Sequence, residues 1–211
     1  MNQRGLGQYD EEYRACSCFW GTEPGQYVRL LTKYLRNGRA LDLGAGEGKN
    51  AIYLAEQGFE VTAVECSKYA INNFSQRLSQ VDSGVRNRIQ IVMADVRTYV
   101  PQHEYEAVIS YGLLHCLQNL DDVYKVVKSM HKYTVSGGYN VVVVLTNRIN
   151  SPQIQEYLEI LEISRSYLEQ LYKGWEIVSF DDSALEERHP TSNVVHQHSI
   201  IRLLAQKELC R

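Results

Sequence analysis

Hydrophobic positions follow two different periods along this chain, and the two periods alternate. Short apolar runs typical of buried strands fall at residues 39–43, 59–64, 88–93, 105–110 and 138–145. Helical spacing or helix-start chemistry marks residues 25–35, 47–57, 68–80, 119–131 and 151–171. Two more apolar runs, at residues 175–180 and 194–204, end the series. The sequence therefore predicts strands that alternate with helices over most of its length.

Such an alternation implies a parallel sheet with helices on both faces. The connection between the last two strands, residues 181–193, has no clear helical pattern, so we expect a hairpin-like pair with an antiparallel final strand. We predict an α/β, Rossmann-like three-layer sandwich with a seven-stranded, mostly parallel sheet. We expect a single domain over residues 1–211, in which residues 1–24 form an N-terminal cap.

Four aromatic side chains give this N-terminal segment its character. They are Tyr9, Tyr13, Phe19 and Trp20. They can close over a site as a lid that excludes water, or they can pack on the sheet. The sequence leaves both arrangements open.

Composition and charge restrict the class of protein. The 211 residues are 44% hydrophobic and 22% charged, which is ordinary for a globular chain. The net charge is −3 and no basic stripe is visible, so we expect no nucleic-acid partner. No apolar run reaches about 18 residues and no signal core is apparent, so we expect neither secretion nor a membrane span.

The chain contains five cysteines, which are widely scattered. They are Cys16, Cys18, Cys66, Cys116 and Cys210. They form no paired CxxC framework, which favours reduced thiols and a cytoplasmic protein. A disulfide between the first two, or half of a metal site there, is the less favoured alternative.

The most informative segment is ALDLGAGEGKN, at residues 40–50. A strand ends there, a glycine turn follows, and a helix begins, which lets a ligand approach the backbone closely. The dinucleotide pattern GxGxxG would need a third glycine at Lys49, and Asp42 would repel a pyrophosphate. The observed spacing, GxGxG after an acid, resembles the first motif of S-adenosylmethionine (SAM) methyltransferases. In that motif the acid can hold the loop and lie near the ammonium of the methionine moiety.

Two acids end the next two predicted strands. Glu65 closes the second strand, where a carboxylate can accept both ribose hydroxyls of a nucleoside. Asp95 closes the third, where it suits an adenine amino group, with the Val96 N–H available to a ring nitrogen. A lone acid at a strand end is usually just solvated, but two acids in order after such a loop favour a nucleoside site.

Ligands of open α/β sheets bind beyond the carboxyl ends of the strands. The fourth strand ends there in the segment 111–115, and no D/N-P-P-Y/F/W signature of DNA base methylation is present. Methyl transfer needs mainly alignment and water exclusion, and a base only when the acceptor loses a proton. His115 is a candidate base or substrate contact, or else a structural histidine bonded to backbone.

Three more histidines occur near the C-terminus: His189, His196 and His198. The last two lie two residues apart, so on a strand they share one face. An antiparallel final strand would bring its start to the same sheet edge. The cluster can contact substrate, act as a base or hold a metal, or it can simply be solvent-exposed. We include no metal in the predicted site.

Taken together, the chain resembles class I SAM-dependent methyltransferases over about residues 20–205. The segments FWGTEP (19–24), LDLGAGEGKN (41–50) and GFEVTAVE (58–65) are similar to the tellurite-resistance branch and its small-molecule relatives. The branch commonly has Cys where Ala45 stands and Arg where Lys49 stands. The part after about residue 145 matches less specifically.

This resemblance implies a SAM cofactor, with S-adenosylhomocysteine (SAH) as product, and a small-molecule partner. The expected cofactor contacts are Trp20, Asp42, Gly44, Ala45, Gly46, Gly48, Asn50, Glu65, Cys66, Asp95, Val96 and Tyr111. The candidate catalytic groups are Tyr111, His115, His189, His196 and His198. We expect methyl transfer to N, O, S or a chalcogen; the alternative is a non-catalytic SAM-binding protein of the same fold. An NAD-type oxidoreductase is disfavoured by the misfit at Lys49.

Overall fold

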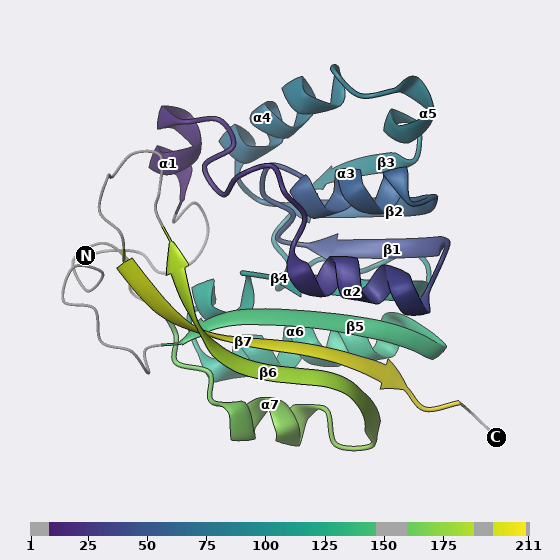
Figure 1. The fold of residues 1–211 in the computed structure, drawn as a ribbon, viewed down its shortest axis with the longest axis vertical. Coiled ribbons are helices and arrows are strands. Elements are labelled where there is room, and N and C mark those ends of the chain that lie inside the picture. The colour runs from purple at the N-terminus through teal and green to yellow at the C-terminus, as the bar shows by residue number, and fades with distance from the viewer. Residues whose placement is uncertain (1–8, 147–159, 188–195, 210–211) are drawn as a thin grey trace.

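One seven-stranded sheet organises the computed structural model, which describes residues 9–146, 160–187 and 196–209 (Figure 1). The strands are β1 (Gly38–Leu43), β2 (Phe59–Glu65), β3 (Ile89–Met93), β4 (Tyr105–Tyr111), β5 (Thr134–Thr146), β6 (Trp175–Glu187) and β7 (His196–Lys207). Their order is β3-β2-β1-β4-β5-β7-β6; β1 to β5 pair in parallel, and β7 is antiparallel to both its neighbours. The predicted sheet, with its antiparallel last strand, is confirmed.

Helices cover both faces of this sheet. They are α1 (Asp10–Ala15), α2 (Gln26–Tyr34), α3 (Lys49–Glu56), α4 (Lys68–Leu78), α5 (Ser83–Arg86), α6 (Leu120–Tyr133) and α7 (Arg165–Leu171), with a 3-10 turn at Leu114–Cys116. One apolar cluster packs α2, α3 and α4 on the sheet through Leu31, Leu54 and Phe74. A second cluster packs α6 and α7 on the opposite face through Met130 and Leu168. The three layers follow from these two buried surfaces.

The helix α6 shows how the sequence pattern produces these layers. Val123, Val126 and Met130 recur at helical spacing and are buried against the sheet. Asn119 caps the helix, because its side-chain oxygen accepts the Asp122 N–H at 2.9 Å. The helix therefore begins where the sequence pattern predicted it.

The predicted helix over residues 151–171 is wrong in extent. Residues 151–159 lie outside the described chain, residues 160–164 are not helical, and α7 begins at Arg165. Ser164 caps α7 by accepting the Tyr167 N–H at 3.1 Å. Residues 160–164 make a contact outside α7, because the Leu161 N–H donates to the carbonyl of His115 at 2.7 Å.

Two strands are longer than predicted. β5 begins at Thr134, directly after α6, and pairs with Tyr105 across a register shift in β4. β6 continues past Phe180 to Glu187, through the segment that we expected to be a connection. Its polar residues hid the strand pattern; they pair along β7, with Asp181 directly opposite Arg202.

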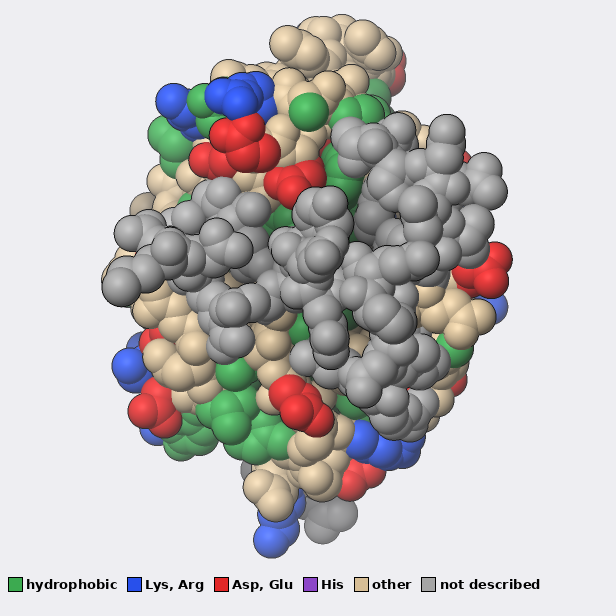
Figure 2. Space-filling model, turned by 90° about the vertical axis from the view of Figure 1, so that its left-hand side faces the viewer, with side chains coloured by type: hydrophobic (Ala, Val, Ile, Leu, Met, Phe, Trp, Pro, Cys, Tyr) green, Lys and Arg blue, Asp and Glu red, His purple; other side chains and the backbone are tan. Residues whose placement is uncertain are grey.

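The chain order reverses between β1 and β4, which are neighbours in the sheet. A crevice at such a switch point, beyond the carboxyl ends of the strands, is where α/β folds bind ligands. Within the described residues, no helix is both long and apolar enough to cross a bilayer. On the face drawn in Figure 2, the described basic side chains are interspersed with acidic ones.

Candidate functional site

A cavity of about 460 Å³ lies at the carboxyl edge of the sheet, next to the switch point. Its size is within the range of about 300–1,000 Å³ that is usual for small-molecule sites. The predicted cofactor residues that line it are Trp20, Gly44, Ala45, Gly46, Asn50, Glu65, Cys66, Asp95, Val96 and Tyr111. Asp42 and Gly48, also predicted, lie behind this wall and do not line the cavity.

The glycine loop between β1 and α3 is fixed by its own backbone. The N–H groups of Gly44 and Ala45 both donate to the carbonyl of Val64, at 2.9 and 3.0 Å. Gly48 caps α3 with φ +78°, and an added Cβ would lie 2.0 Å from the ring of Phe74. Glycine is therefore required at this position both by backbone conformation and by the packing of α4.

Asp42 is buried beneath this loop, with 1% of its surface exposed. Burial, followed by the charge of Glu65, raises the pKa of Asp42 to about 7, against an opposing effect of Lys49. Its Oδ2 atom has no hydrogen-bond partner in the described part of the chain. Oδ2 is thus unsatisfied, and the carboxyl group titrates near neutral pH.

Glu65, at the end of β2, is oriented by three backbone donors. Its Oε1 accepts the N–H groups of Cys66 and Ser67, and its Oε2 accepts that of Gly46, all at 2.8 Å. A carboxylate oxygen has two acceptor positions, so one remains on Oε2. Oε1 already accepts two hydrogen bonds. The sequence suggested that both Glu65 oxygens accept ribose hydroxyls, and for Oε1 this requires one of its N–H bonds to be replaced or shared with the hydroxyl.

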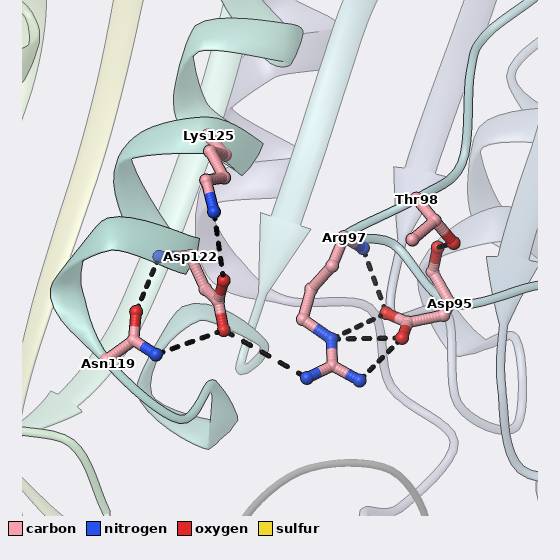
Figure 3. Close-up of polar contacts among 6 residues, drawn as sticks. All are labelled: Asp95, Arg97, Thr98, Asn119, Asp122 and Lys125. Carbon is pink, nitrogen blue, oxygen red and sulfur yellow. Dashed lines mark hydrogen bonds and ion pairs between the residues drawn. The ribbon is translucent and has the colours of Figure 1, made fainter.

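Asp95, after β3, is engaged by a residue that the sequence analysis missed (Figure 3). The Arg97 guanidinium donates to both Asp95 oxygens at 2.6–3.0 Å, and these bonds lower the pKa of Asp95. Arg97 Nη1 also lies 4.0 Å from Asp122 at the start of α6. Arg97 lines the cavity and links the tip of β3 to α6. Its place two residues after the acid was the only available signal.

The N-terminal segment lies against the cavity, and Tyr9, Tyr13 and Trp20 line it. Figure 1 shows its helix α1 beside α4. Burial, followed by the charge of Glu65, raises the pKa of Tyr13, so its hydroxyl stays protonated. Three of the four aromatic side chains thus line the cavity, whereas Phe19 is buried and does not, and the role of the segment as a lid stays a prediction.

Polar contacts from the glycine loop, α3 and α4 fix this segment. Glu47 Oε1 accepts the Cys18 N–H at 2.7 Å and the Asn73 amide at 2.9 Å. Lys49 Nζ donates to the carbonyl of Trp20 at 2.9 Å, and Asn50 Oδ1 accepts the Gly25 N–H at 2.8 Å. Glu47 and Asn73 could not be assigned these roles from sequence, because the two contacts of Glu47 span 29 and 26 residues.

At the end of β4, Tyr111 and His115 both line the cavity. His115 is buried, and its Nδ1 accepts the Leu145 N–H at 3.1 Å. In the neutral ring, an accepting Nδ1 requires the proton to be on Nε2, which is then a donor. His115 is therefore arranged to donate a hydrogen bond, and in this tautomer neither ring nitrogen is available as a base.

The C-terminal histidines are only partly described. His189 lies outside the described residues. His196 and His198 are the first and third residues of β7, whose Ser199 is opposite Thr146, the last residue of β5. The start of β7 is thus at the carboxyl edge, as an antiparallel strand requires, and the roles of the three side chains stay predictions.

The four cysteines of the described chain form no disulfide, and Cys210 lies outside it. Cys66 and Cys116 line the cavity. Burial raises the pKa of the Cys116 thiol to about 12, so it is protonated at neutral pH. Among the described residues, no cluster of three or more His, Cys, Asp or Glu side chains has the geometry of a metal site.

Known proteins share this architecture. The strand order, with the antiparallel β7 beside β5, is that of the class I methyltransferase fold. The family model "Tellurite resistance protein TehB" matches residues 22–199, and the chain belongs to this family. The resemblance found in the sequence is therefore confirmed.

Individual relatives are distant. A protein of Haemophilus influenzae, "Probable S-adenosyl-L-methionine-dependent methyltransferase TehB", is 26% identical over 153 residues, covering 72% of this chain and 51% of the relative. The chain thus spans about half the length of that relative. The crystal structure of TehB from Haemophilus influenzae superposes with a TM-score of 0.74 and 21% identity, over 96% of this chain and 67% of that one.

A second solved structure matches nearly the whole length of both chains. It is described as "Conversion of a Disulfide Bond into a Thioacetal Group during Echinomycin Biosynthesis". The TM-score is 0.74 at 21% identity, over 98% of this chain and 93% of that one. At this identity the similarity shows a shared fold.

Proposed function

We propose that this chain is a SAM-dependent methyltransferase that acts on a small molecule. The observation that carries the proposal is the arrangement around one cavity of a glycine loop and two strand-end carboxylates, Glu65 and Asp95. The name of the Haemophilus relative supports it. We also propose a single domain, since one sheet joins residues from β1 to β7.

The residues present fit such a cofactor. Glu65 keeps an acceptor position for a ribose hydroxyl. Asp95 would accept an adenine amino group only by giving up part of its bonding to Arg97, while the Val96 N–H lies beside it at the cavity. Asp42 is buried under the loop with a pKa of about 7, and a cationic methionine end bound above the loop would favour its ionised form. The cofactor would supply a methyl group already activated by a positive sulfur.

The chain's own contribution is then alignment and exclusion of water. Tyr9, Tyr13 and Trp20 form an aromatic cover over the cavity, fixed from below by Glu47 and Lys49. His115 accepts the Leu145 N–H at Nδ1, so we assign it a structural role and no role as a base. Acceptors that enter as free nucleophiles need no base at this position.

Two measurements test the proposal. Calorimetry with SAM and SAH should give binding near one ligand per chain, and NAD should not bind. Transfer of a labelled methyl group to a pool of small metabolites should then be detectable. Binding of neither SAM nor SAH would overturn the proposal, and binding without transfer to any acceptor would favour the non-catalytic alternative.

A further inference from the structure

Arg202 is a buried cation in the half of the cavity farthest from Glu65 and Asp95 along the sheet order. It lies on β7 opposite Val143 of β5, and Val143 in turn lies opposite Tyr111 of β4. Its side chain is 9% exposed and lines the cavity. A guanidinium is rarely buried to this degree without a partner that explains it.

The contacts of Arg202 within the described chain use only one of its three nitrogens. Nη1 donates to Asp181 Oδ2 and to Ser183 Oγ, both at 2.7 Å. Nε is buried and has no hydrogen-bond partner among the described residues. A buried donor without a partner costs about 1–3 kcal/mol, which a ligand can recover.

The geometry of a guanidinium indicates which kind of ligand would pair with the unpartnered Nε. Nε and Nη2 point their N–H groups along the same edge, which binds a carboxylate through two parallel hydrogen bonds. In Arg202 the two contacts on Nη1 leave that edge without a protein partner within the described residues, and because Nε is buried, a ligand must displace neighbouring atoms to reach it. The unused edge matches a planar oxyanion better than it matches a neutral group.

The surrounding charges favour an anion as well. Asp181, the ion-pair partner of Arg202, is 45% exposed, so water screens much of its charge. A second cation, Lys49 Nζ, lies 5.8 Å from the centre of the Tyr111 ring. Glu23 also lines this end, but it is 82% exposed and pairs with Arg29 at 3.4 Å.

We infer that the methyl acceptor carries a carboxylate group that binds the Nε–Nη2 edge of Arg202. The inference rests on the proposed function, since it names the substrate class for that same cavity. Two strand spacings of about 4.8 Å separate the backbones of Arg202 and Tyr111, roughly 10 Å in all. A small organic acid spans this interval, with its carboxylate at β7 and its nucleophilic atom near Tyr111.

The test uses simple acids on the SAH-saturated protein. The probes are benzoate, phenylacetate and 3-phenylpropanoate, each compared with its uncharged amide by ligand-observed NMR. We expect at least one acid to bind roughly tenfold more tightly than its amide, as a charge-assisted hydrogen-bond pair implies. Arg202→Met should abolish this preference while SAH affinity, measured by calorimetry, stays within about twofold of the parent.

Two further variants control for folding and for charge alone. Asp181→Asn keeps the guanidinium and should preserve or increase the preference for the acid. Arg202→Lys keeps a cation but lacks the planar edge, so the preference should fall well below the parent value. It also serves as the test variant if Arg202→Met does not fold.

The outcomes separate this inference from the proposed function. Equal affinity for every acid and its amide in the parent protein would overturn the inference, as would a preference that survives in both Arg202 variants. SAH binding would leave the proposed function intact in either case. A parent protein that fails to bind SAH would overturn the proposed function itself.

Discussion

The two ends of the cavity are built by different means. At the cofactor end, backbone N–H groups set the position of Glu65, and Asp95 is bound by a residue only two positions away, Arg97. At the acceptor end, side chains bind one another or a distant backbone group, as in the pair Arg202–Asp181 and the bond from Leu145 to His115. Point substitutions can therefore remodel the acceptor end while the cofactor end keeps its geometry.

We expect the largest loss of cofactor affinity from the substitution Glu65→Gln. The carboxylate accepts hydrogen bonds from backbone N–H groups at both of its oxygens. In the amide one of these oxygens is replaced by an NH₂ group, a donor that would face those N–H groups. We expect SAH affinity to fall roughly 100-fold, about 3 kcal/mol, by calorimetry. The matched control is Glu60→Gln, on an exposed position of the same strand, which should leave affinity unchanged. Parent-like affinity in the Glu65 variant would show that this carboxylate does not contact the ligand.

Gly48→Ala tests whether the loop is fixed by packing. The new Cβ would lie 2.0 Å from the Phe74 ring, at a φ that disfavours alanine. Gly174→Ala is the control, because its φ of +86° imposes similar strain and nothing lies within 4 Å of the added atom. We expect the Gly48 variant to lose about 2–3 kcal/mol more unfolding free energy in urea than the control. Equal losses would mean that backbone conformation alone demands glycine.

Asp42→Asn sharpens the electrostatic part of the comparison. The pKa of Asp42 is about 7 in the folded chain against an ordinary value of 3.8, so the native state holds the extra proton between these values. Stability contributed by this group is therefore greatest at low pH and falls as pH rises from about 4 to 7.

Relative to Asp42→Asn, the parent protein should lose about 2–3 kcal/mol of unfolding free energy between pH 5 and pH 8. Urea titrations at both pH values measure the difference. Parallel pH profiles for the two proteins would contradict the raised pKa and the burial that causes it.

At the acceptor end, substitutions of His115 should have a smaller effect on the unfolding free energy, and His115→Asn serves as the control for His115→Leu. His115→Leu leaves the Leu145 N–H buried without an acceptor, which should cost about 1–2 kcal/mol of unfolding free energy. His115→Asn can keep an acceptor near the position of Nδ1 and should cost less. If methyl transfer is measured, the pH profile of His115→Asn should match that of the parent. A lost ionisation in that profile would show that His115 acts as a base after all.

Much of the fold was predictable because its central strands, such as β4 and β5, are largely buried on both faces. The apolar run of β5 and the glycine turn after β1 have few other structural interpretations. The misses share a cause, since tertiary contacts override local pattern. Polar residues such as Asp181 and Ser183 obscure β6, and the bond from Leu161 to His115 holds residues 160–164 out of the helix predicted there.

The site divides in the same way. Glu65 and Asp95 could be found because they stand directly at strand ends, where the sheet fixes their location. Arg97, Glu47 and Arg202 could not, because their roles arise only when separate segments meet in space. His115 was ambiguous in the sequence, and a single backbone contact decides its tautomer.

The backbone hydrogen bonds of the glycine loop also affect which nucleotides can bind there. The N–H groups of Gly44, Ala45, Gly46 and Gly48 all donate to groups of the protein itself. A pyrophosphate would find these four donors already satisfied and would have to displace carbonyl or carboxylate acceptors to use them. Discrimination against dinucleotides is thus a property of the main chain, and placing a third glycine at Lys49 would not by itself convert the loop into one that binds them.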